Sequence, residues 1–274
     1  MKTLLALLVT GGLSLSIAAS SSIGFVKSNG TFRVDGSTIR GNSTLVEGNV
    51  VETSEARSVV QIGGVQIALF PDSRAKLYRD HAVFQKGSGV ASSADKYVIE
   101  ANVLRIAPAT KGSIVQVEMR DNTTVAVAAS IGAANVRNAA GVLLANLRPG
   151  EALAFDSKAG AAEALAISGV LQEKGGEYFL TDATTNVTVE LQGPDLAKYV
   201  GKKVDVTGST IPNANAAPGA SQVARVVSIK PVAGGGMSGT ALGIIIGGVA
   251  VGGTLAGLGA AGTFSGGASP ASVQ

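Results

Sequence analysis

The chain has 274 residues, with 37 glycines, 4% aromatic residues and no cysteine. Without cysteine, disulfides, thiolate metal sites, a cysteine nucleophile and a lipoprotein anchor are excluded. The net charge is +3 and no basic run is interleaved with aromatic residues, so we expect no nucleic-acid partner. The length suits two small domains, and the content of Val, Ala, Thr and Gly favours short strands and tight turns.

The first twenty residues have the pattern of a secretory signal. Lys2 supplies the positive charge, residues 4–17 are mostly apolar, and Ala18-Ala19-Ser20 offers a small-residue exit. We therefore expect residues 1–20 to be a signal peptide and the β domains to lie outside the cytoplasm. A retained membrane anchor is the alternative, although the apolar run is short for a span.

Residues 23–156 alternate between apolar and polar side chains, as half-buried strands do. Gly63-Gly64 interrupts one such run, and a two-residue loop there would pair Ile62 with Val65. Gly-Gly suits this loop because both central residues of a type I′ turn need a positive φ. The sequence thus predicts a hairpin at the heart of an all-β domain.

A second hairpin is predicted within residues 115–127. A three-residue loop, Arg120-Asp121-Asn122, would pair Val117 with Val125 and place Asn122 in the left-handed conformation. A two-residue loop at Asp121-Asn122 would instead turn the apolar face outward, because a one-residue slip reverses every side chain. The longer loop is the preferred prediction.

The stretch LVEGNVVETSEARSVVQIGGVQIALFPDSRAKL, residues 45–77, resembles the FecR-like domain. Gln85-Lys86-Gly87 is similar to the Gly-led return strand of that family, and LLANLRPGEALAF (143–155) to its closing strand. The resemblance spans residues 23–156 and implies a role in signal reception or envelope organisation. Many FecR-type regulators carry a cytoplasmic anti-sigma segment before an internal membrane span. The export signal of this chain argues against direct sigma-factor control.

A linker and a second β unit are predicted after this domain. Residues 157–166 (SKAGAAEALA) are small and weakly helical, and residues 167–232 carry further strand patterns. Gly175-Gly176 forms a turn that places Lys174 opposite Glu177. Five strands with a short helix before the fourth resemble a small OB-like barrel. Few aromatic side chains are available on it, so nucleic-acid binding is not carried over.

Residues 239–264 form an uncharged, glycine-rich stretch of about 26 residues, longer than the roughly 20 that span a bilayer. We predict a transmembrane helix here, followed by a tail at 265–274; a disordered glycine-rich tail is the alternative. Glycines four apart let helices approach closely. The predicted helix-packing residues are Gly239, Gly243, Gly247, Gly248, Gly252, Gly253 and Gly257. No Lys or Arg follows Lys230, so the orientation and the membrane stay open.

Nothing in the sequence predicts a catalytic, cofactor-binding or metal-ligating residue. His81 is the sole histidine, and we expect it on the surface or in a turn, with Asp80 pointing to the opposite face. No G-x-S-x-G elbow occurs. Scattered carboxylates leave a glycosidase pair open, because pairing in space is invisible in sequence.

These observations predict an all-β chain. It would hold a signal peptide (1–20), a FecR-like sandwich or solenoid-like domain (23–156), a linker (157–166), an OB-like barrel (167–232) and a transmembrane segment (239–264). The expected function is that of a non-catalytic bacterial envelope protein that binds a protein or cell-wall glycan, without cofactor. The alternative is a self-assembling structural component, a homo-oligomer driven by the glycine-zipper segment.

Overall fold

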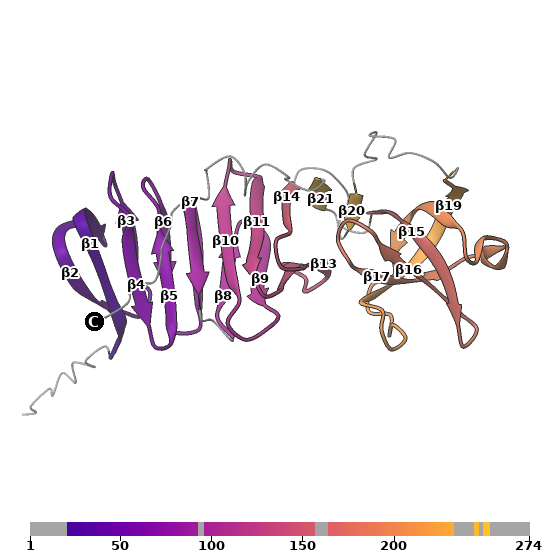
Figure 1. The fold of residues 1–274 in the computed structure, drawn as a ribbon, viewed down its shortest axis with the longest axis horizontal. Helices are drawn as coiled ribbons and strands as arrows, with labels where there is room; N and C mark the ends of the chain where they lie inside the picture. The colour runs from indigo at the N-terminus through magenta and orange to yellow at the C-terminus, as the bar shows by residue number, and fades with distance from the viewer. Residues whose placement is uncertain (1–20, 93–95, 157–163, 233–243, 247–248, 253–274) are drawn as a thin grey trace, which may run out of the picture.

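The structure, a computed structural model, describes residues 21–92, 96–156, 164–232, 244–246 and 249–252. The predicted signal peptide, the predicted tail and most of the predicted linker lie outside these residues. The described chain consists of strands and one short 3₁₀ helix, which confirms the all-β prediction. Figure 1 shows an elongated molecule, with β1 to β14 stacked along the long axis and a rounded unit at one end.

The first unit, here called the layered unit, contains β1 to β14. Its strands are β1 (Ser22–Val34), β2 (Ser37–Val46), β3 (Val50–Thr53), β4 (Ser58–Ile62), β5 (Val65–Leu69), β6 (Arg74–Leu77), β7 (His81–Ser92), β8 (Val98–Ala101), β9 (Leu104–Pro108), β10 (Ile114–Met119), β11 (Thr124–Ile131), β12 (Ala134–Asn138), β13 (Leu143–Leu147) and β14 (Ala152–Asp156).

This unit has two layers, and two long strands, β1 and β7, run from one layer into the other. Each of them changes partners along its length. The first half of β1 pairs with β4 and its second half pairs with β3. The first half of β7 pairs with β6 and β8, and its second half with β5 and β10. One layer continues through β11 to β14, and the other through β9 and β12 to β13.

The core between the layers consists of alternating apolar side chains. Phe32, Phe84 and Phe155 are its largest fully buried residues. The predicted hairpin at Gly63-Gly64 is confirmed, with Ile62 opposite Val65. Only Gly63 of the two glycines has a positive φ, 55°, so the turn departs from type I′.

The prediction for the β10–β11 hairpin is wrong in register. Val117 lies opposite Val127 rather than Val125, and the backbone N–H of Arg120 donates to the carbonyl of Thr124 at 3.0 Å. Asn122 is not among the residues with positive φ. The shift is by two residues, which keeps the apolar face toward the core.

The second unit is a small closed barrel of β15 (Ala164–Lys174), β16 (Glu177–Asp182), β17 (Thr188–Gln192), β18 (Lys203–Thr210) and β19 (Gln222–Pro231), with the 3₁₀ helix η1 (Leu196–Tyr199) before β18. The pairings close a ring in the order β15, β16, β17, β19, β18 and back to β15. Lys174 lies opposite Glu177 as predicted. The strand β15 begins at Ala164, inside the predicted linker.

The glycine-rich C-terminal stretch contains strands where the sequence predicted a helix. β20 (Ile244–Ile246) and β21 (Val249–Gly252) form a hairpin, with β21 on β14 and β20 on β15. Figure 1 shows both strands between the layered unit and the barrel. Glycine disfavours a helix in water, and the free edges of β14 and β15 offer backbone partners to β21 and β20 as strands. The helical prediction is therefore corrected for these residues. Among the described residues no helix is long and apolar enough to cross a membrane.

Candidate functional site

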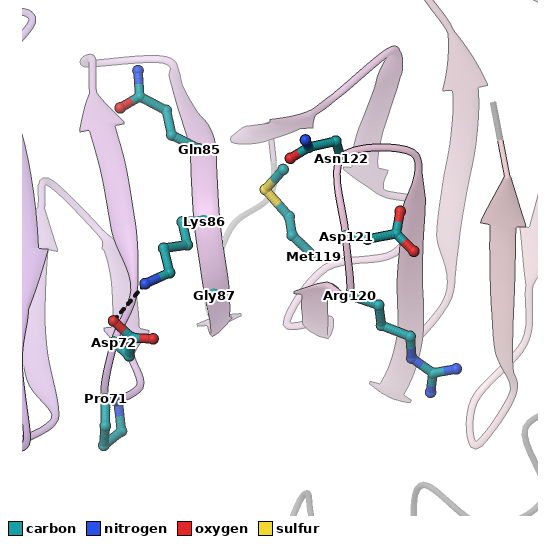
Figure 2. Close-up of a pocket in the computed structure, with 9 residues that line it drawn as sticks. All are labelled: Pro71, Asp72, Gln85, Lys86, Gly87, Met119, Arg120, Asp121 and Asn122. Atoms are coloured by element: carbon teal, nitrogen blue, oxygen red, sulfur yellow. Dashed lines mark hydrogen bonds and ion pairs between the residues drawn. The ribbon is translucent and has the colours of Figure 1, made fainter. Parts of the chain in front are cut away.

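A cleft of about 520 Å³ opens on the layered unit beside the point where β7 changes layers. It is formed by three segments that are distant in sequence: the β5–β6 turn, the middle of β7 and the β10–β11 loop. The lining residues are Pro71, Asp72, Gln85, Lys86, Gly87, Met119, Arg120, Asp121 and Asn122. Figure 2 shows Met119 and Asn122 directed toward β7, with Arg120 and Asp121 directed away from it.

Buried hydroxyl groups hold the β5–β6 turn against β7 beneath the cleft. The hydroxyl of Ser73, a residue that is 2% exposed, donates to the carbonyl of Ser88 at 2.8 Å and accepts from the N–H of Ser88 at 2.9 Å. The N–H of Ser73 donates to the hydroxyl of Thr53 at 2.9 Å. These buried groups satisfy one another, so the β5–β6 turn is bonded to β7 next to the cleft.

Gly87 permits this close approach of the turn to β7. Its φ is 77°, and a Cβ atom there would lie 2.6 Å from the Cα of Ser73 and 2.7 Å from the carbonyl oxygen of Asp72. No side chain fits such distances without moving backbone. The glycine singled out by the FecR-like resemblance therefore lies at the wall of the cleft.

The charges in the cleft are balanced. The ammonium group of Lys86 lies 2.6 Å from a carboxylate oxygen of Asp72, and both side chains are largely exposed. The side-chain carbonyl of Gln85 accepts from the Nε of Arg74 at 2.7 Å. A cleft of this kind suits a ligand that offers both hydrogen-bond donors and acceptors, and it gives no strong attraction for either sign of net charge.

Asp121 shapes the outer wall of the cleft. One of its carboxylate oxygens accepts hydrogen bonds from the N–H groups of Thr123 and Thr124, both at 2.7 Å, and from the hydroxyl of Thr123 at 2.9 Å. These donors lower the pKa of Asp121 to about 2. This turn moves the loop to residues 121–123, which is the physical reason for the register error above.

A smaller hollow, of about 300 Å³, lies on the barrel beside the Gly175-Gly176 turn. It brings together Glu177 of β16 and Glu190 of β17. Glu190 is 4% exposed and accepts from the N–H of Ala217 at 2.8 Å and from the side-chain amide of Gln192 at 3.2 Å. The hydrogen bond of Ala217 lowers the pKa of Glu190, whereas hydrogen bonding to Glu190 raises that of Glu177.

His81 lies at the start of β7, away from both hollows. Its Nδ1 is 2.8 Å from a carboxylate oxygen of Asp80, and its ring stacks on Tyr78 at a centroid distance of 4.2 Å. The prediction that Asp80 and His81 point to opposite faces is wrong, because Asp80 precedes the strand and does not share its alternation. The hydrogen bond with His81 lowers the pKa of Asp80.

The structure places the predicted site residues as follows. Gly252 lies in β21 opposite Ala154, in a strand and not on a helix face. Gly239, Gly243, Gly247, Gly248, Gly253 and Gly257 lie outside the described residues. Sequence reasoning missed Met119 and Asp121 as cleft residues. The one local signal was Asp121 followed two residues later by Thr123, a pattern typical of a turn in which aspartate accepts from the backbone.

Within the described part of the chain, no group of three or more His, Asp or Glu side chains is arranged to hold a metal ion. Comparison with family models, curated proteins and solved structures gives no match. The functional argument therefore rests on the geometry of the cleft and on its chemistry.

Proposed function

We propose that this chain is a non-catalytic, exported protein of the bacterial cell envelope, whose FecR-like layered unit binds a protein or a cell-wall glycan through the cleft beside β7. The observation that carries the proposal is the cleft itself. Gln85 and Lys86 stand on the paired strand β7, and buried hydroxyl groups hold the β5–β6 turn beside it, so this part of the cleft is formed before a partner binds. Signal reception in the envelope is the role that the FecR-like resemblance favours.

The barrel supports the OB-like part of this reading. In chain order, the third and fifth strands of the barrel, β17 and β19, are parallel neighbours, and η1 lies between the third and fourth strands, β17 and β18. In OB-folds the outer face of the second and third strands binds oligonucleotides or oligosaccharides. The exposed carboxylate of Glu177 on that face, next to the buried Glu190, would repel phosphate, which favours the glycan over nucleic acid as the partner class.

The test is binding of the full mature chain to purified, insoluble cell-wall glycan, measured by co-sedimentation. The double variant Lys86→Gln, Asn122→Ala removes one charged and one neutral group from facing walls of the cleft. We expect the dissociation constant to rise about tenfold or more, the effect of losing one hydrogen bond to a charged group.

A matched control, Lys27→Gln with Asn42→Ala, makes the same replacements at exposed, paired positions of β1 and β2. It should bind as the parent does. A photo-crosslinker at position 122, compared with one at Arg40, tests for a protein partner in cells. The proposal would be contradicted if the cleft variant bound the glycan as the parent does and crosslinking were equal at positions 122 and 40.

The alternative, self-assembly through the glycine-zipper segment, stays a prediction. Gly243 and Gly247 lie outside the described residues, so its test is made on the chain in detergent. Resistant oligomers that disappear in the Gly243→Leu, Gly247→Leu variant would favour it over a monomeric binding protein.

A further inference from the structure

The C-terminal hairpin and the cleft are joined by a short ladder of strands. Ala250 of β21 lies opposite Asp156 of β14, and Asp156 lies opposite Thr124 of β11. The N–H of Thr124 donates to the carboxylate of Asp121, whose loop forms the outer wall of the cleft. Ala250 of the hairpin thus lies two strand spacings, roughly 10 Å, from Thr124, the first residue of β11.

The other strand of the hairpin reaches the barrel. Ile245 of β20 lies opposite Ala166 of β15, while β15 pairs with β18 along its other edge. The hairpin therefore completes one edge on each unit. In its absence the backbone groups of residues 154–156 on that side of β14 would turn to water, and an edge strand opens at a lower free energy than a strand paired on both sides.

We propose that the hairpin β20–β21 is a clasp that orders the outer wall of the cleft. When it pairs with β14, the end of β14 stays fixed against Thr124, and the Asp121 turn is held in place. When it leaves, β14 frays at Asp156 and the β10–β11 loop loosens with it. Partner binding at the cleft is thereby regulated from the C-terminal segment, a consequence that rests on the proposed function, whereas the ordering itself does not.

The experiment uses the absence of cysteine from the chain. The variant Ala154→Cys, Gly252→Cys places two thiols at opposed positions of β14 and β21. The control pair, Arg33→Cys with Thr38→Cys, lies at opposed positions of β1 and β2, far along the chain from the clasp. A third chain ends after Val232 and lacks the hairpin. Amide hydrogen exchange is followed by mass spectrometry in peptides covering residues 119–126 and 152–156.

We expect the truncated chain to exchange about tenfold faster in both peptides, and no faster in residues 22–46, because one ladder of backbone hydrogen bonds is lost. Oxidation of the Ala154–Gly252 pair should slow exchange in residues 119–126 relative to the reduced form. Oxidation of the control pair should leave that peptide unchanged.

Exchange in residues 119–126 that is equal in all forms would overturn the clasp, as would failure of the Ala154→Cys, Gly252→Cys pair to oxidise. If exchange responds as expected but the Lys86→Gln, Asn122→Ala variant binds its glycan normally, the clasp stands and the proposed function of the cleft fails. The two inferences are therefore tested separately.

Discussion

The side-chain amide of Asn186, in the barrel, donates a hydrogen bond to the carbonyl of Asn146, on the edge strand β13 of the layered unit, at 3.1 Å. The N–H of Asn146 in turn donates to the carbonyl of Thr185 at 2.7 Å, so the loop pairs with β13 much as a strand would. The hairpin β20–β21 covers β14, the last strand of the other layer. Both layers are thus capped where they meet the barrel, which limits edge-to-edge association.

Asn186 is expected to be the key residue of this junction. It has a φ of 56° and also donates to a carboxylate oxygen of Glu151 at 2.9 Å. Asn186→Gly keeps the backbone conformation and removes both hydrogen bonds, so the free energy of unfolding should fall by about 1 to 3 kcal/mol. Asn186→Ala should cost about 1 kcal/mol more because alanine resists a positive φ. Urea unfolding measures both.

The control for the junction is Asn213→Gly. Asn213 has a φ of 58° and is exposed in the β18–β19 loop. Its replacement should change the free energy of unfolding by no more than about 0.5 kcal/mol. Equal effects at 186 and 213 would show that backbone conformation, and not the contact between the units, sets the cost.

Gly87→Ala should be among the most destabilising single substitutions in the layered unit. The added Cβ meets the backbone of Ser73 and Asp72, and the φ of 77° is strained for alanine. We expect a loss of about 2 to 5 kcal/mol in thermal or urea unfolding. Gly64→Ala, whose Cβ would meet nothing within 4 Å, is the matched control and should cost about 0.5 kcal/mol or less. A small loss of unfolding free energy in Gly87→Ala would mean that the β5–β6 turn can move away from β7.

The carboxyl group of Asp121 should titrate with a midpoint of about 2, below its ordinary value of 3.8, in a carbon-13 NMR titration. Because the pKa is lower in the folded state, the ionised carboxylate stabilises the loop at pH values above the ordinary pKa. That stabilisation is lost as the pH falls from about 4 toward 2. Thr123→Val removes the hydroxyl donor and should raise the midpoint, whereas Thr123→Ser should keep it low. A midpoint near 3.8 in the parent chain would refute the Asp121 turn in solution.

Glu177→Gln should make the barrel more stable at neutral pH. The hydrogen bond with Glu190 raises the pKa of Glu177, so its contribution is fully present below the ordinary value of 4.5 and is lost as pH rises through the raised value. Glutamine keeps a donor toward Glu190 at every pH. The melting temperature of the variant should exceed that of the parent at pH 7, with a smaller difference at pH 4.

Glu173→Gln is the control for this effect, because it removes one exposed carboxylate from the neighbouring strand β15. Its change in melting temperature should not follow the pH course of Glu177→Gln. Matching curves would assign the effect to net charge alone.

The sequence by itself determined the local pairings. Gly63-Gly64 and Gly175-Gly176 each separate two alternating runs, so the turn fixes which neighbours face one another, as in Ile62 with Val65 and Lys174 with Glu177. The alternating runs also indicate the all-β class, and Pro194 with Gly201 marks the short helix before β18. The β10–β11 register was not predicted, because the side chain of Asp121 sets that loop and not the backbone conformation of a glycine or asparagine.

Only the tertiary structure decided the rest. The cleft joins residues 71–72, 85–87 and 119–122, which meet because β7 changes layers at Gly87. The C-terminal stretch is apolar and uncharged enough to predict a membrane helix, yet β20 and β21 pair with the free edges of β14 and β15. Hydropathy describes a segment's solvent preference, whereas unpaired backbone edges elsewhere in the chain determine which partner its N–H and C=O groups find.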